Sequence, residues 1–411
     1  MARASVRALI WSVAARDRFL RLASCALPPA PLGCGAHMKA ILPYVLLLSA
    51  LPALASAQNA PPTVSVARWP QDRVAAISLT FDDGINSHLD FVGPILKKHR
   101  LNATFFVTTG MGPWEKRKSE WKQLALDGNE LANHTVHHPC LLEQITPHSQ
   151  NYTPAMFEAE IRDAALDLLK TLNSNRGLTF AYPCGNMSFG KPQEEVANAA
   201  LYLRYVSEHA FAARAVNGGP VNPDELNVLA VGDLGPTAGK DFPALLAQAE
   251  TAFVSHNWGV FCFHGVGGDW LAITPEALDE LAAYLERHAD VWTAPFGDAV
   301  RYIQERKALS VHITSNNLTS LDLALQWPLE RQIYDLPLTL KVQLPSAWSP
   351  ITATADGEPL ETRVTGRGSL GASGSAKSTS NDLTKPSASP TEILLDVPAQ
   401  TKSVHLVASA R

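Results

Sequence analysis

Short apolar runs alternate with helical patterns from Val74 to about Ala308, and this alternation limits the fold more than any other feature of the sequence. The clearest helical pattern covers 155–172, where apolar residues recur at helical spacing. Strands that alternate with helices predict a parallel sheet, and closure of that sheet into a (β/α) barrel is a common solution. The expected strands cover residues 74–81, 103–107, 129–133, 178–181, 205–207, 228–231, 260–263 and 291–293.

The polar residues that follow these runs indicate where a site would form. In parallel folds the reacting groups lie at the carboxyl ends of the strands, because the loops there converge on one face. Asp82, His134, Pro183 and His264 each follow an expected strand. We therefore expect these four positions to lie together.

After Leu309 the pattern changes to short alternating runs between turn residues, which is typical of a small β-sandwich. Trp327 and Trp348 in this part are expected to be packed aromatics rather than sugar platforms. A Gly, Ser, Thr and Lys-rich stretch is predicted to be a loop of low complexity. The predicted organisation is a leader at 1–57, a linker at 58–70, an α/β domain at 71–308 and a β-rich domain at 309–411, with the loop near 366–390.

The N-terminal segment carries the parts of a secretory signal peptide. Met38 and Lys39 precede an apolar run at 41–54, and the small residues Ala55, Ser56 and Ala57 follow it. The run is short for a membrane span. We expect a signal peptide at 38–57, a secreted or periplasmic protein, and no membrane span in the mature chain.

The net charge and the cysteine count limit the classes of binding partner and the disulfides that the chain can have. The formal net charge is -5, so there is no basic excess that would indicate nucleic acid binding. Three cysteines follow residue 57, namely Cys140, Cys184 and Cys262, and this low, odd number excludes a disulfide framework. One bridge is the most that three cysteines can form, and we interpret all three as core or pocket-lining thiols. The oligomeric state is left open.

The run TFDDG at 80–84 places two carboxylates side by side at a strand end. Adjacent like charges are costly, and a cation relieves that cost. Neighbouring side chains diverge, so one Asp can bind an ion while the other stays free beside it. Gly84 allows a sharp turn. The alternative is an ordinary Asp-Asp-Gly turn without a ligand.

The run HTVHHP at 134–139 supplies imidazoles. Residues four apart share one face of a helical turn, so His134 and His138 can reach one ion. Two neutral imidazoles and one carboxylate leave an open position, as catalytic zinc sites do. If the segment is not helical, His137 becomes an alternative ligand, and a solvated His-rich loop is the alternative without metal.

Two later runs supply single groups. VFCFHG at 260–265 delivers His264 from an apolar strand, which suits a general acid or base. FAYPCG at 180–185 ends a strand with a turn that exposes a backbone N–H, which suits an oxyanion. Taken alone, both runs are also compatible with purely structural roles.

In order and spacing, these runs resemble the NodB-homology polysaccharide deacetylases, carbohydrate esterase family four, over roughly residues 70–308. TFDDG and HTVHHP match the first two motifs of that family, and LNATFFVTTG at 101–110 is also similar. The resemblance implies a distorted (β/α) barrel of the polysaccharide-deacetylase type. It implies that Asp82 is the catalytic base and His264 the general acid, and it assigns the metal to Asp83, His134 and His138.

The chain departs from the family pattern in the third motif. The family's base-orienting Arg is replaced by Ala181, which leaves the orientation of Asp82 unexplained. Cys184 stands where the family's oxyanion-binding backbone N–H comes from a Tyr. Tyr182 and Trp270 are assigned with Cys184 to the oxyanion and substrate side, and Asp233 is the candidate for the Asp that tunes the acid His.

We therefore predict a hydrolase that removes acetyl groups from an acetylated glycan, as an N-deacetylase or an O-acetyl esterase. The expected cofactor is a divalent metal, with zinc favoured and cobalt or nickel as alternatives. The alternative function is a catalytically decayed carbohydrate-binding or assembly protein on the same barrel, and a metal-free amidase would need a disrupted ligand set.

Overall fold

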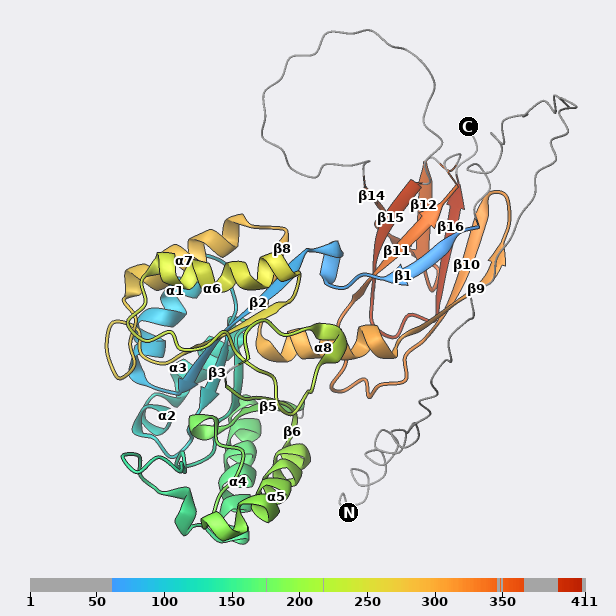
Figure 1. The fold of residues 1–411 in the computed structure, drawn as a ribbon. Helices are drawn as coiled ribbons and strands as arrows, with labels where there is room; N and C mark the ends of the chain where they lie inside the picture. The colour runs from blue at the N-terminus through green and yellow to red at the C-terminus, as the bar shows by residue number, and fades with distance from the viewer. Residues whose placement is uncertain are drawn as a thin grey trace, which may run out of the picture. The chain divides into compact units, whose positions relative to one another are not determined.

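A computed structural model describes residues 61–174, 176–216, 218–345, 348, 350–365 and 391–408, and Figure 1 shows its fold. The expected leader at 1–57 and the low-complexity loop at 366–390 lie outside the described residues. No helix within the described ranges combines the length and the apolar character needed to cross a membrane.

A parallel sheet forms the centre of the α/β part. Its strands follow the order β6-β5-β4-β3-β2-β7, and β8 also pairs with β2. Every residue of β2 is buried, because helices cover one face and side chains of the barrel interior cover the other. The expected distorted (β/α) barrel is confirmed. The strand bounds are β2 Ala75–Asp83, β3 Thr104–Val107, β4 Glu130–Asn133, β5 Leu178–Ala181, β6 Ala210–Arg214, β7 Trp258–Phe263 and β8 Val291–Thr293.

Helices surround this sheet and bury their apolar stripes against it (Figure 1). Thr153, Asp241 and Thr274 cap three of them by accepting a backbone N–H three residues on. A π-helical turn at His88–Val92 leads into the first α-helix. The helix bounds are α1 Gly93–Lys98, α2 Gly112–Lys116, α3 Lys118–Leu126, α4 Pro154–Leu172, α5 Glu195–His209, α6 Phe242–Ser255, α7 Pro275–Arg287 and α8 Phe296–Ala308.

Two expected strands are wrong. Residues 205–207 belong to α5, and the strand is β6, which begins after this helix at Ala210. Residues 228–231 form no strand. Instead, the chain from Val231 to Pro236 lies between β6 and β7 and makes single bridges from Arg214 to Val231 and from Pro236 to Cys262. A short irregular segment therefore fills the gap between these two strands.

The β-rich part consists of two antiparallel sheets with a shared apolar core, so the sandwich-like fold is confirmed. Trp348 is buried in this core, and the Trp327 indole N–H donates to the Thr401 carbonyl. The sheets are β1-β11-β15-β14 and β13-β12-β16-β10-β9, with bounds β9 Ser310–Asn316, β10 Ser320–Gln326, β11 Leu338–Leu344, β12 Ile351–Ala355, β13 Glu358–Leu360, β14 Arg363–Thr365, β15 Thr391–Val397 and β16 Ser403–Ala408.

The first strand of the chain belongs to this β-rich part. β1 covers Thr63–Val66 and pairs with β11, so part of the expected linker at 58–70 is a sheet strand. Figure 1 shows β1 among the strands of the C-terminal residues. The chain thus contributes to the β-rich part both before and after it forms the barrel.

Candidate active site

The end of β2 places two carboxylates in different surroundings. Asp82 and Asp83 are the last two residues of the strand, and both side chains are buried. Asp83 adopts a positive φ of 81°, and Gly84 follows with a φ of 69°. An alanine at Gly84 would bring its Cβ to 2.8 Å from a methyl group of Val107, so this turn requires glycine.

Asp83 lies with two histidines in a cluster whose ligand atoms are all within 4.8 Å of one another. Its Oδ1 is 3.5 Å from Nε2 of His134 and 3.5 Å from Nε2 of His138. A carboxylate and two imidazoles are the donor set of catalytic zinc sites, which leave a position open for a reactant. These three residues can hold a divalent ion.

The loop that carries both histidines is not helical. Thr135 and His138 both have left-handed backbone angles, with φ of 68° and 57°. The Thr135 hydroxyl accepts the His138 N–H at 2.9 Å and closes the loop. The expectation that a helical turn aligns the two histidines is therefore wrong, and the irregular loop brings them together.

Glu160 of α4 holds this loop by hydrogen bonds to its backbone and to a side chain. The sequence patterns did not reveal this role of Glu160. Its carboxylate accepts the backbone N–H groups of Val136 and His137 at 3.1 and 2.8 Å. It also contacts the His137 ring at 2.9 Å and accepts the Tyr152 hydroxyl at 3.1 Å. His137 thus faces Glu160, and its side chain is 59% exposed, so it lies outside the ligand cluster.

The surroundings of the histidines suit metal binding. Burial lowers the pKa of His138 to about 4, and the charge of His134 adds to this effect, so the His138 ring is neutral at pH 7. Burial also acts to lower the pKa of His134, but the bond to Asp83 and the two carboxylate charges outweigh it and raise the pKa. The Nδ1–H of His134 donates to the Ala181 carbonyl at 2.9 Å, which turns Nε2 toward Asp83.

Asp82 is paired with an arginine from another strand. The guanidinium of Arg214, at the end of β6, forms a buried ion pair with Oδ2 of Asp82. Burial acts to raise the pKa of Asp82, but the charges of Arg214, His134 and His264 together outweigh it and lower the pKa. In the parallel register, Arg214 is the partner of Ala181, the position that lacks the expected Arg. The side chain that orients Asp82 therefore comes from the adjacent strand at the same level.

Sequence reasoning missed Arg214 because it placed the strand at 205–207 instead of 210–214. An arginine directly after the apolar run Ala210–Ala213 was the available signal. Asp233 lies 3.8 Å from Nη1 of Arg214, so the candidate for tuning the acid His also faces the arginine.

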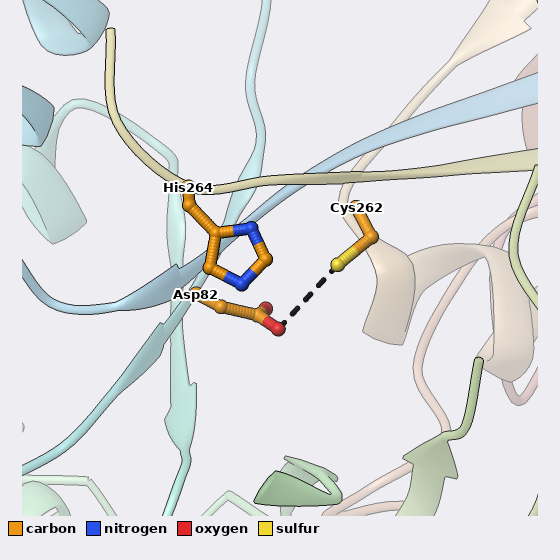
Figure 2. Close-up of side chains that lie close together, drawn as sticks. All are labelled: Asp82, Cys262 and His264. Atoms are coloured by element: carbon orange, nitrogen blue, oxygen red, sulfur yellow. Dashed lines mark hydrogen bonds between the residues drawn. The ribbon is translucent and has the colours of Figure 1, made fainter. Parts of the chain in front are cut away.

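His264 and Cys262 complete the surroundings of Asp82 (Figure 2). The Cys262 thiol donates to Oδ2 of Asp82 at 3.5 Å. Beneath the site, the buried His88 ring donates from Nε2 to the His264 carbonyl at 3.0 Å. Cys262 and His264 line a hollow of about 260 Å³ together with residues that include Val216, Asp233, Pro236 and Leu271.

A disulfide joins Cys140 and Cys184, so the interpretation of both as thiols is wrong. It connects the loop after His134 and His138 with the turn after β5. Cys184 has a left-handed φ of 52°, and the backbone hydrogen bonds of its turn are donated by Gly185 and Asn186.

The two aromatic residues assigned to the substrate side differ in whether they reach the site. The Tyr182 side chain is buried in an aromatic cluster and donates to the Leu229 carbonyl, so it does not line the site. The Trp270 indole N–H donates to Oδ2 of Asp83 at 2.6 Å, while 45% of the residue is exposed. Trp270 therefore both contacts the Asp83 carboxylate and offers an open aromatic face.

Comparison with known proteins identifies relatives of the chain. Residues 71–203 match the sequence model of the polysaccharide deacetylase family. A gellan lyase from a Bacillus species is 27% identical over 321 residues, which make up 72% of this chain and 12% of that protein. The peptidoglycan-N-acetylmuramic acid deacetylase of Bacillus subtilis is 42% identical over 67 residues, 16% of this chain and 24% of that protein. The chain thus spans less than a quarter of the length of either relative.

Among solved structures, a family 4 carbohydrate esterase from Bacillus subtilis is similar to the chain with a TM-score of 0.37 and 20% identity. The match covers 55% of this chain and 80% of that structure.

Proposed function

We propose that this chain, whose residues 71–203 belong to the polysaccharide deacetylase family, is a divalent-metal hydrolase that removes acetyl groups from a glycan. The division of labour at the end of β2 carries this proposal. Asp83 lies with His134 and His138, whereas Asp82 is paired with Arg214 and lies beside His264. One carboxylate is thus placed for an ion and the other for proton transfer.

The donor set of Asp83, His134 and His138 fits zinc, with cobalt or nickel as alternatives. A divalent ion held there would polarise the acetyl carbonyl and lower the pKa of a water molecule. The neutral state of His138 favours binding, since no proton must leave that ring.

The remaining groups move protons and stabilise charge. Asp82 takes the proton of the attacking water, and the Arg214 charge keeps it ionised and oriented for that step. The Cys184 N–H is the proposed donor to the oxyanion, in a turn that the disulfide fixes. His264 then protonates the leaving sugar nitrogen or oxygen.

Trp270 is the proposed contact for the sugar ring. Its indole N–H is fixed by Asp83, so the exposed aromatic face is held at one orientation beside the residues that would hold the ion. Aromatic side chains bury a large apolar face, and a pyranose ring presents apolar C–H groups to it.

We also propose that the protein is secreted or periplasmic. The Cys140–Cys184 disulfide supports this location, because disulfides persist in oxidising compartments. The signal peptide expected at 38–57 remains a prediction.

Acetate release tests the function. Purified protein is incubated with N-acetylated chitooligosaccharides, peptidoglycan, acetylated xylan and acetylated gellan, with and without a chelator followed by zinc. We expect release from at least one substrate, its loss on chelation and its recovery with zinc. The alternative of a decayed binding protein predicts retained glycan binding and no acetate from any substrate.

A further inference from the structure

We propose that Asp82, Cys262 and His264 form a second metal site, specific for a soft divalent cation, whose occupation inhibits the enzyme. Their ligand atoms all lie within 4.8 Å of one another, as do those of the neighbouring Asp83 cluster. Figure 2 shows the three side chains converging from the ends of β2 and β7. A thiol, an imidazole and a carboxylate are three ligands that one ion can bind together.

One carboxylate oxygen at this cluster remains available. Oδ2 of Asp82 accepts from Arg214 and from the Cys262 thiol, whereas Oδ1 is buried and has no hydrogen-bond partner among the described residues. Buried carboxylate oxygens are normally satisfied, so an unpartnered one is a ready ligand.

The ligand types select the ion. Sulfur is a soft ligand and favours zinc or cadmium over magnesium or calcium, which take oxygen ligands. The positive charge of Arg214 beside Asp82 repels any cation, so only an ion that binds sulfur strongly is expected to overcome this repulsion. On binding, the Cys262 sulfur forms a bond to the ion, and the thiol proton leaves to solvent.

An ion has a route to this cluster. Cys262 and His264 both line the hollow of about 260 Å³ that also contains Asp233 and Leu271. His264 is only partly buried, so it is the first ligand that an entering ion meets.

The consequence rests on the proposed function, because Asp82 and His264 are its proposed base and acid. An ion that binds both removes the proton acceptor and the proton donor at once, while the Asp83 cluster keeps its own ion. We therefore expect excess zinc or cadmium to inhibit without displacing the first metal.

Cadmium titration of the mature protein loaded with one equivalent of zinc tests the site. We expect a second equivalent to bind, an ultraviolet absorption band from thiolate-to-cadmium charge transfer, and parallel loss of acetate release. The matched variant is Cys262→Ser, whose hydroxyl can still donate to Asp82. It should lose the band and, measured against its own activity without cadmium, require at least about tenfold more cadmium for half-inhibition.

The spectroscopic measurement separates this proposal from the proposed function, since the band needs no substrate. Zinc retained by the protein is measured by mass spectrometry, which excludes exchange at the Asp83 cluster. Cys262→Ala serves as a second variant, with circular dichroism as the folding check. A wild-type protein without the band, equal inhibition of wild type and Cys262→Ser, or a band without loss of activity would each overturn the inhibitory site.

Discussion

The two sides of the site begin at adjacent residues but are built differently. The metal side consists of Asp83 and a loop at 134–138, which Glu160 holds in place. The base side joins Asp82 to Arg214 of β6 and to two residues from the end of β7, and the Asp82–Arg214 pair is separated by 132 positions in the chain. The metal side is thus largely a local motif, whereas the base side exists only because distant strands end at one place.

Loss of Asp83 should have the largest effect. In Asp83→Ala the ion loses its only carboxylate ligand in this cluster, so we expect zinc to be lost and turnover to fall by at least about 10⁴-fold. Metal content and acetate release measure both effects. Asp163→Ala on the exposed face of α4 is the control, and stoichiometric zinc with full activity in Asp83→Ala would contradict the ligand assignment.

Loss of Arg214 should separate the two sides. In Arg214→Met we expect zinc affinity to stay within a few-fold and kcat to fall by about 10²–10³-fold, because a misplaced base loses most of its contribution. The pKa of Asp82 should rise without the guanidinium, so the acidic limb of the rate profile should move to higher pH. Leaving Asp82 unpaired should also cost about 3–5 kcal/mol of stability.

The double variant Asp82→Asn/Arg214→Met controls for the stability cost of leaving the Asp82 charge unpaired. It removes both buried charges, so we expect it to unfold at higher denaturant concentration than Arg214→Met while remaining inactive. An unshifted rate profile in Arg214→Met would leave the arginine with a structural role alone.

His88 should make the base side sensitive to acid. Burial lowers the pKa of His88 from 6.5 to about 4, so the unfolded chain binds more protons than the folded chain between these values. The unfolding free energy should therefore fall as pH decreases through this window, by on the order of 3 kcal/mol. Urea titrations from pH 7 to pH 4 measure it, and His88→Asn should show a shallower slope.

Loss of the Glu160 carboxylate should have the smallest effect and should act on the metal side only. Glu160→Gln weakens the hydrogen bonds to the backbone N–H groups of Val136 and His137. Losing a partner that supports a ligand loop typically lowers metal affinity about 10- to 100-fold, so we expect a loss of zinc affinity of about that size. Activity at saturating zinc should be nearly unchanged. Chelator competition measures the affinity, with Glu158→Gln on the same helix as the control.

Most of the barrel could be predicted from the sequence because strong apolar runs and caps coincide there. β5 and α7 begin and end as expected, at Leu178–Ala181 and Pro275–Arg287. The failure at 205–207 has a clear cause, since a short apolar run is compatible with either a strand or a buried helix. The β1 strand was missed because it has four residues and its partner β11 lies far along the chain.

The sequence by itself determined the metal side. TFDDG and HTVHHP contain the three residues of the cluster, although Glu160 and the Ala181 carbonyl also hold the histidine loop. Only the tertiary structure decided that Arg214, the register partner of Ala181, pairs with Asp82 and that Cys140 bonds to Cys184. The physical reason is that paired parallel strands lie about 4.8 Å apart, so side chains at one level become neighbours whatever their separation in sequence.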